Sequence, residues 1–195
     1  MKSDIVLAGV GGQGILTIAT ILGSAALSDG LHLKQAEVHG MSQRGGDVQS
    51  NLRISSAPIH SDLIPKGGAD LIVSLEPMEA LRYQPFLSKS GWIVTSTLPF
   101  VNIDNYPDME AIEQELARHD HTVCFDMEAA AKEVATARSS NLVLLGAASP
   151  FIDIPTEKIE AAIADVFGRK GEAVVKSNVE AYRAGRQRAL DMINN

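Results

Sequence analysis

The chain has 195 residues, of which 45% are hydrophobic and 21% charged, the balance of a globular protein that can close one sizeable core. Its formal net charge of −7 excludes a field that would draw it to nucleic acid or to an anionic membrane. A single cysteine, Cys124, excludes an internal disulfide, an iron–sulfur cluster and a cysteine-rich zinc site built from this chain alone. No window approaches the roughly 20 apolar residues that span a bilayer. We therefore expect one domain over residues 1–195, in the cytoplasm, with no metal, nucleic-acid or membrane partner.

The first elements alternate between strand and helix. Residues 4–8 (DIVLA) form a wholly apolar run, which is typical of a strand buried on both faces of a parallel sheet. Apolar residues at three- and four-residue steps from Ile15 predict a helix that stops at Asp29-Gly30, and residues 31–38 predict a second strand.

A glycine-rich loop comes next and leads into a strand with strict alternation of side chains. The two sides are Val48, Leu52 and Ile54, and Gln49, Asn51 and Arg53. We expect the second side to be wet or to meet a partner.

Further strands are predicted at residues 69–75, 91–98 and 121–126, with a short helix starting at Pro77 between the first two. The run SSNLVLLGAAS predicts a buried helix. Two more helices follow, one over residues 156–167 capped by Thr156 and one from Glu172 to the end. This alternation predicts a three-layer α/β Rossmann-like sandwich with a mostly parallel sheet, whose ligands lie beyond the carboxyl ends of the strands.

A glycine turn connects the first strand to the first helix with the spacing GxGxxG. Its residues are Gly9, Gly11, Gly12, Gln13 and Gly14. Bare backbone and the free amides of a helix start form a site for a phosphate or carboxylate, and Gln13 adds a neutral donor and acceptor. Glu37 lies where a dinucleotide site has its ribose acceptor, which favours a nicotinamide or flavin cofactor. The alternative is that the glycines only permit a tight turn.

The loop after the second strand, HGMSQRGGDVQSNLR, carries the densest cluster of ligand-binding polar groups in the chain. These are His39, Ser42, Gln43, Arg44, Asn51 and Arg53, with Gly40, Gly45 and Gly46 between them. Arg44, followed by Gly45 and Gly46, suits a bidentate grip on a carboxylate or phosphate. The alternative is a surface ion pair of Arg44 with Asp47 or Glu37. In the predicted fold this loop and the glycine turn share one edge of the sheet and meet.

Other titratable residues receive structural interpretations. His39 is a lone histidine at a strand end and is expected to be a hydrogen-bonding residue. His119 and His121 flank Asp120 without a third metal ligand at a known spacing, which favours a turn. Glu76 and Glu79 bracket Pro77 at a helix start, where acidic residues cap the helix.

Four segments, "GVGGQGI", "EVHGMSQRGGDVQSNLRIS", "LEPMEALRY" and "NVEAYRAG", together resemble the gamma-type subunits and domains of the 2-oxoacid:ferredoxin oxidoreductases, most closely the small subunits that act on indolepyruvate. The resemblance covers nearly the whole chain. It implies CoA-dependent oxidative decarboxylation of a 2-oxoacid to an acyl-CoA and carbon dioxide, with ferredoxin as electron acceptor. Thiamine diphosphate, magnesium and iron–sulfur clusters would then belong to a large alpha subunit, and this chain alone would be inactive.

The resemblance also assigns candidate contacts for substrate or coenzyme. They are Gly9, Gly11, Gly12, Gln13 and Gly14 of the turn and Met41, Ser42, Gln43, Arg44 and Gly45 of the loop, with Arg44 as the candidate catalytic residue. Under this interpretation Glu37 serves loop structure instead of NAD binding. Two alternatives stay open at this point: a free-standing NAD(P)- or flavin-dependent oxidoreductase, and a non-catalytic subunit that only braces a partner.

Overall fold

A six-stranded sheet forms the centre of the computed structural model, which describes residues 1–39, 45–101 and 103–194. The strand order is β2-β3-β1-β4-β5-β6. The strands are β1 (Lys2–Val10), β2 (His32–His39), β3 (Asp47–Ser55), β4 (Ala69–Ser74), β5 (Leu87–Ser96) and β6 (Thr122–Phe125). Only β3 runs against the others, since it pairs antiparallel with both β1 and β2 while β1, β4, β5 and β6 pair in parallel. The predicted mostly parallel sheet is confirmed.

The strand β1 lies in the middle of the sheet because nearly all its side chains can be buried. From Ser3 to Val10 every residue of β1 is buried. Alternate residues serve the two faces: Ile5 and Leu7 belong to one apolar core, and Val6 and Ala8 to the other.

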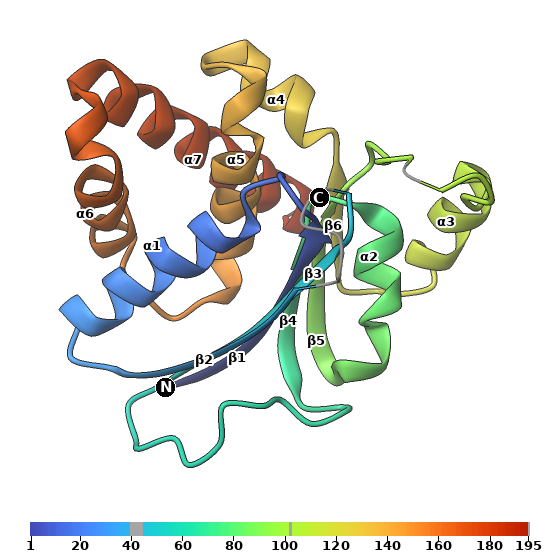
Figure 1. The fold of residues 1–195 in the computed structure, drawn as a ribbon, viewed down its shortest axis with the longest axis horizontal. Coiled ribbons are helices and arrows are strands. Elements are labelled where there is room, and N and C mark those ends of the chain that lie inside the picture. The colour runs from blue at the N-terminus through green and yellow to red at the C-terminus, as the bar shows by residue number, and fades with distance from the viewer. Residues whose placement is uncertain (40–44, 102, 195) are drawn as a thin grey trace.

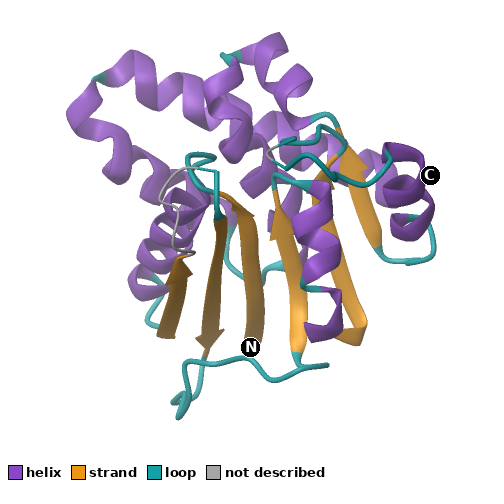
Figure 2. Ribbon diagram, turned by 45° about the vertical axis from the view of Figure 1, so that its right-hand side comes forward, coloured by secondary structure: helices purple, strands orange, loops and turns teal. Residues whose placement is uncertain are grey.

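Helices cover both faces of the sheet but unequally (Figure 1). The larger layer contains α1 (Ile15–Ser28), α4 (Met127–Val134), α5 (Ser140–Ala148), α6 (Thr156–Phe167) and α7 (Glu172–Ile193). The opposite face carries α2 (Pro77–Arg82), which packs on β1, β4 and β5, and α3 (Met109–Leu116), which packs against α2 (Figure 1 and Figure 2). Short 3-10 turns, at Ala137–Ser139 and Gly168–Lys170 among others, connect the helices. The three-layer α/β architecture expected from the sequence is confirmed.

Two glycines allow α5 and α7 to cross with their backbones in contact. A Cβ atom on Gly146 would lie 1.9 Å from the carbonyl oxygen of Tyr182, and one on Gly185 would lie 1.9 Å from that of Val143. The "NVEAYRAG" segment therefore has a packing role, because its last residue, Gly185, contacts the backbone of α5 at Val143.

Two expectations from the sequence are wrong in detail. The side of β3 that carries Asn51 and Arg53 is not wet: Asn51 is 4% exposed, and Arg53 donates to both carboxylate oxygens of Asp4 and to two carbonyls of the segment 56–68. This segment covers the guanidinium, and Asp4 neutralises it. Thr156 does not cap its helix, since it is the first helical residue and Pro155 precedes it as the cap without a side-chain hydrogen bond.

Candidate functional site

The glycine turn and the loop before β3 meet at the carboxyl edge of the sheet. The amide of Gly11 donates to the carbonyl oxygen of Gly46 over 2.9 Å, and the amide of Gly45 approaches the carbonyl of Gly11 at 3.5 Å. The contact follows from the register, because Val10 pairs with Asp47 where β1 ends and β3 begins. The predicted meeting of the two segments is confirmed for Gly11, Gly45 and Gly46. Met41, Ser42, Gln43 and Arg44 lie outside the described residues, as does Gly40.

The glycines of the turn are required for different structural reasons. Gly12 and Gly14 have φ angles of 106° and 78°, which residues with a Cβ rarely adopt. Gly9 has no such angle, but a Cβ there would lie 2.8 Å from Oε1 of Gln13. That oxygen accepts from the amide of Val10 over 2.8 Å, so Gln13 closes the turn on itself. The expectation that bare backbone is needed here is confirmed.

The helix α1 starts at this turn with its first amides uncapped. Its cap residue is Gly14, which has no side chain to accept from them, and no acidic residue lies in the first turn. Asn141 of α5 donates from Nδ2 to the carbonyl oxygen of Gly14 over 3.3 Å, which fixes the turn against the helical layer. An uncapped start of a 14-residue helix favours an external anion.

A cavity of about 180 Å³ lies beside the turn, beyond the carboxyl ends of β4 and β5. Its lining includes Gln13, Leu75, Ser96, Phe100 and Ser140. These residues follow the carboxyl ends of the neighbouring parallel strands β1, β4 and β5 or belong to the helical layer. The cavity therefore lies where α/β sheets bind their ligands.

Sequence reasoning missed the network that shapes this cavity around Glu76. Glu76 is 1% exposed; its carboxylate accepts from the amide of Glu79 over 2.8 Å and from that of Phe100 over 3.3 Å. The hydroxyl of Tyr106 donates to the same carboxylate, and burial together with this acid raises the pKa of Tyr106. The predicted capping role of Glu76 is confirmed. Its second role, fixing Tyr106 and the cavity-lining Phe100, had no local sequence signal.

A second network ties the start of β3 to α2. The hydroxyl of Tyr83 donates to Oδ2 of Asp47 over 2.6 Å, and burial followed by this acid raises the pKa of Tyr83. Glu79 is 3% exposed and accepts two hydrogen bonds from Arg82. Burial raises the pKa of Glu79 and outweighs its attraction to Arg82, with Asp47 adding to the rise. Asp47 directly follows Gly46, so this network fixes one end of the arginine-bearing loop.

Four apolar side chains stand exposed next to the cavity, in the segment after β5. Leu98, Phe100, Val101 and Ile103 are 41–68% exposed. A run of large exposed apolar side chains at one site is typical of a surface that contacts another molecule. The sequence pattern of this region predicts only the end of a strand.

Glu37 lies far from the glycine turn because β3 is inserted between β1 and β2. In a dinucleotide fold the strand bearing the ribose acceptor is the neighbour of β1, so Glu37 is one inter-strand spacing, about 5 Å, further away. Its carboxylate accepts from Gln35 over 2.5 Å. The structure therefore disfavours the dinucleotide alternative.

His119, Asp120 and His121 lie in the turn expected for them, where His121 stacks on Trp92 with ring centroids 4.8 Å apart.

Comparison with known proteins decides the family. Residues 4–188 match the family model described as pyruvate ferredoxin/flavodoxin oxidoreductase. The chain belongs to this family. The resemblance expected from the four sequence segments is confirmed.

The relatives are similar to this chain over nearly its full length. A protein of Pyrococcus horikoshii named indolepyruvate oxidoreductase subunit IorB is 36% identical, over 98% of both chains. The gamma subunit of the keto/oxoacid ferredoxin oxidoreductase from Geobacter sulfurreducens is 25% identical over 98% of both chains, with a TM-score of 0.74. The 2-oxoglutarate:ferredoxin oxidoreductase of Magnetococcus marinus shares the fold at 24% identity and a TM-score of 0.77, where this chain spans 31% of that one.

No helix in the described ranges is both long and apolar enough to cross a membrane. The thiol of Cys124 is half-buried, and burial followed by the charge of Glu113 raises its pKa to about 11, so it is an unreactive packing residue.

Proposed function

We propose that this chain is the small subunit of an indolepyruvate:ferredoxin oxidoreductase in the cytoplasm. Such an enzyme decarboxylates an aryl 2-oxoacid oxidatively with coenzyme A, giving an acyl-CoA and carbon dioxide while ferredoxin takes the electrons. Family membership and the 36% identity to an indolepyruvate oxidoreductase subunit support this assignment.

Within the complex, a large partner subunit would hold thiamine diphosphate, magnesium and the iron–sulfur clusters, which supply the decarboxylation and electron-transfer chemistry. With one cysteine, this chain cannot ligate a cluster by itself. Its contribution would be one wall of a shared pocket, and the exposed apolar side chains beside that wall, those of Leu98, Phe100, Val101 and Ile103, would offer a contact surface for the partner.

The observation that carries the proposal is the hydrogen bond between Gly11 and Gly46, which joins the glycine turn to the loop bearing Arg44. The uncapped amides of α1 and the guanidinium of Arg44 would together bind the anionic groups of substrate or coenzyme A. The turn from Gly9 to Gly14 and the loop from Met41 to Gly45 would also keep water out of the pocket.

Kinetics of the reconstituted complex test this role. Arg44→Ala is expected to lower kcat/KM for indolepyruvate and coenzyme A by roughly tenfold or more, as loss of a charge-assisted contact predicts. The matched control is Arg118→Ala, since Arg118 is an exposed residue at the opposite edge of the sheet and forms a surface ion pair with Glu115. If Arg44→Ala left the kinetics of an intact complex unchanged, the proposed pocket role would be wrong, and the alternative of a subunit that only braces its partner would remain.

A further inference from the structure

A second cavity, of about 480 Å³, lies within the helical layer. It opens between the start of α1, the 3-10 turn Ala137–Ser139, the start of α5 and the junction of α6 with α7. Its volume falls in the range of small-molecule sites. No role described so far uses it.

The charges around this cavity have one sign. Arg138 and Lys170 line it, and no acidic side chain does among the described residues, although the protein carries a net charge of −7. Neither cation forms an ion pair with any residue that the structure describes. Lys170 instead lies over the ring of Phe167, with its nitrogen 5.2 Å from the ring centroid. Two unpaired cations at one opening favour an anionic ligand.

A buried hydrogen-bond donor faces the same space. Asn178 of α7 lines the cavity and is 6% exposed. Its Oδ1 accepts from the hydroxyl of Ser139 over 3.1 Å, which directs the amide nitrogen elsewhere. That nitrogen donates to no group in the described part of the chain. The nitrogen is not fully enclosed by protein atoms and opens on the cavity, where a ligand or a water molecule can accept its hydrogen bond.

Helix starts and apolar walls complete the site. The helix α5 begins with no side-chain cap and no acidic residue in its first turn, so the positive end of its dipole is uncompensated in this region. The 22-residue helix α7 also begins without a side-chain cap, but Glu172 in its first turn offsets its dipole. Leu142, Phe167 and Val174 form apolar walls. The site therefore combines cations and donors with a surface that can bury an aromatic or aliphatic body.

We propose that this cavity binds a small organic anion, in which a carboxylate or phosphate group contacts Arg138, Lys170 and Asn178 while an apolar body packs on Leu142 and Phe167. Thr17 of α1 and Asn141 also line the cavity, and Asn141 holds the glycine turn through Gly14. A ligand here would contact the residues that fix the turn. This inference does not rest on the proposed enzymatic function, because it needs neither the partner subunit nor turnover.

Nuclear magnetic resonance titration of the ¹⁵N-labelled full chain tests the site with three probes: phenylacetate, phenyl phosphate and the uncharged benzyl alcohol. Saturable shifts in the amides of Thr17, Ser177 and Asn178 with either anion, and none with the alcohol, are expected. The anion that binds more tightly distinguishes a carboxylate from a phosphate as the natural group. Failure of both anions to saturate, equal binding of the alcohol, or shifts confined to residues 9–14 would overturn the proposal.

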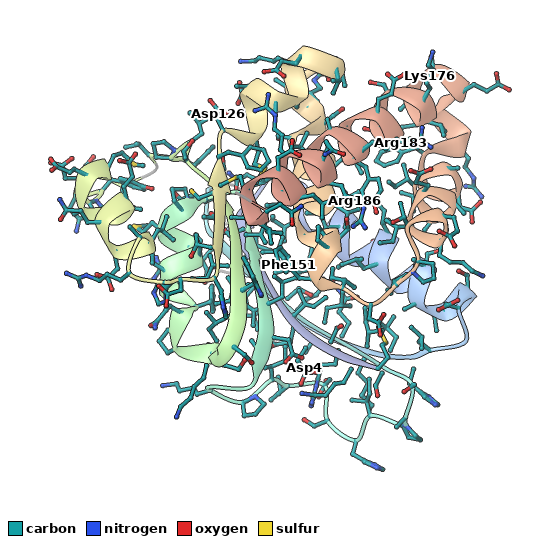
Figure 3. All side chains as sticks on the ribbon, turned by 180° about the vertical axis from the view of Figure 1, so that it is seen from behind. Asp4, Asp126, Phe151, Lys176, Arg183 and Arg186 are labelled. Carbon is teal, nitrogen blue, oxygen red and sulfur yellow. The ribbon has the colours of Figure 1, made fainter. Side chains whose placement is uncertain are left out.

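Charge variants distinguish binding in this cavity from general electrostatic attraction of an anion to the protein surface. The double variant Arg138→Gln/Lys170→Gln is expected to weaken binding by roughly tenfold or more. The matched control, Arg169→Gln/Lys176→Gln, changes the net charge equally at exposed residues that do not line the cavity. Lys176 stands well out on α7 in Figure 3. All four positions are exposed, so both variants should fold, which their melting temperatures check. An equal loss in the two variants contradicts the proposal.

Discussion

The backbone amide of Gly11 donates to the carbonyl oxygen of Gly46 over 2.9 Å, and this bond, together with the longer one from the Gly45 amide to the Gly11 carbonyl, joins the glycine turn to the loop that carries Arg44. Both segments also have a second anchor. Asn141 holds the turn through Gly14, and Tyr83 holds the end of the loop through Asp47. The carboxyl edge of the sheet is thus fixed from the helical layer on one side and from α2 on the other.

Gly14→Ala should destabilise the protein more than Gly12→Ala. Both residues have positive φ, a conformation that costs a residue with a Cβ roughly 1–2 kcal/mol. Only at Gly14 would the new Cβ also collide, 2.8 Å from Nδ2 of Asn141, whereas at Gly12 nothing lies within 4 Å. Urea unfolding of the two variants measures the difference, and equal losses would show that the Asn141 contact does not constrain the turn.

Gly185→Ala should disrupt the packing of α7 on α5. Its Cβ would lie 1.9 Å from the carbonyl of Val143, a backbone atom that cannot move aside, so the loss should reach about 3 kcal/mol or more. Gly168→Ala is the control, because Gly168 has helical angles and open space around it. That variant should be neutral or stabilised by up to about 1 kcal/mol. Thermal melts compare them, and a mild effect at Gly185 would refute the close crossing.

Tyr106→Phe should loosen the segment over the first cavity. The change keeps the ring but removes the hydroxyl that donates to the buried Glu76, which should reduce the free energy of unfolding by about 1.5–3 kcal/mol. Amide hydrogen exchange should quicken in residues 98–106 and stay unchanged in α6, which packs in the other layer. Wild-type exchange in that segment would mean that Glu76 does not hold it.

Stability should fall in acid partly through Asp4, which lies at the opposite end of the sheet from Asp126 (Figure 3). Burial alone would raise the pKa of Asp4, but hydrogen bonds from Arg53 and Lys2 outweigh it and hold the pKa below the ordinary 3.8. A lowered folded pKa means that the pair stabilises the protein above pH 3.8 and that this contribution is lost as the pH falls through the lower value.

Urea midpoints at pH 7 and pH 3 measure this contribution. Asp4→Asn should lose about 3 kcal/mol at pH 7, since it leaves Arg53 partly unpaired, and should show a smaller drop between the two pH values than the wild type. Asp62→Asn, in the exposed loop after β3, should keep the wild-type drop. If the stability of Asp4→Asn fell between pH 7 and pH 3 as much as that of the wild type, other groups would be responsible for the acid dependence.

The strands and helices could be predicted from the sequence because their apolar periodicity is local. The apolar run 4–8 predicts a buried strand, and the glycines after it require a turn. The position of β3 between β1 and β2 could not be predicted, since strand order depends on long-range pairing. For that reason the spacing of Glu37 suggested a ribose contact that the sheet does not allow.

The polar networks could likewise not be predicted from short sequence segments. Glu76 could be recognised as a helix cap from Pro77 beside it, but its bond to Tyr106 joins residues far apart in the chain. Arg53 was expected on a side that is wet or meets a partner, because alternation alone cannot show that another segment of the same chain covers it. The cavity near Asn178 arises from four helix ends that no short motif brings together.

Hydrogen–deuterium exchange of this chain, alone and assembled with the large partner subunit that the proposed function requires, tests the central claim most directly. If the glycine turn and the loop form a wall of a shared pocket, peptides covering residues 9–16 and 40–48 should become protected on assembly, with further protection when coenzyme A is added. Residues 118–121, at the opposite edge, should not change. Protection confined to other surfaces, with residues 9–16 and 40–48 exchanging as in the free chain, would contradict the account.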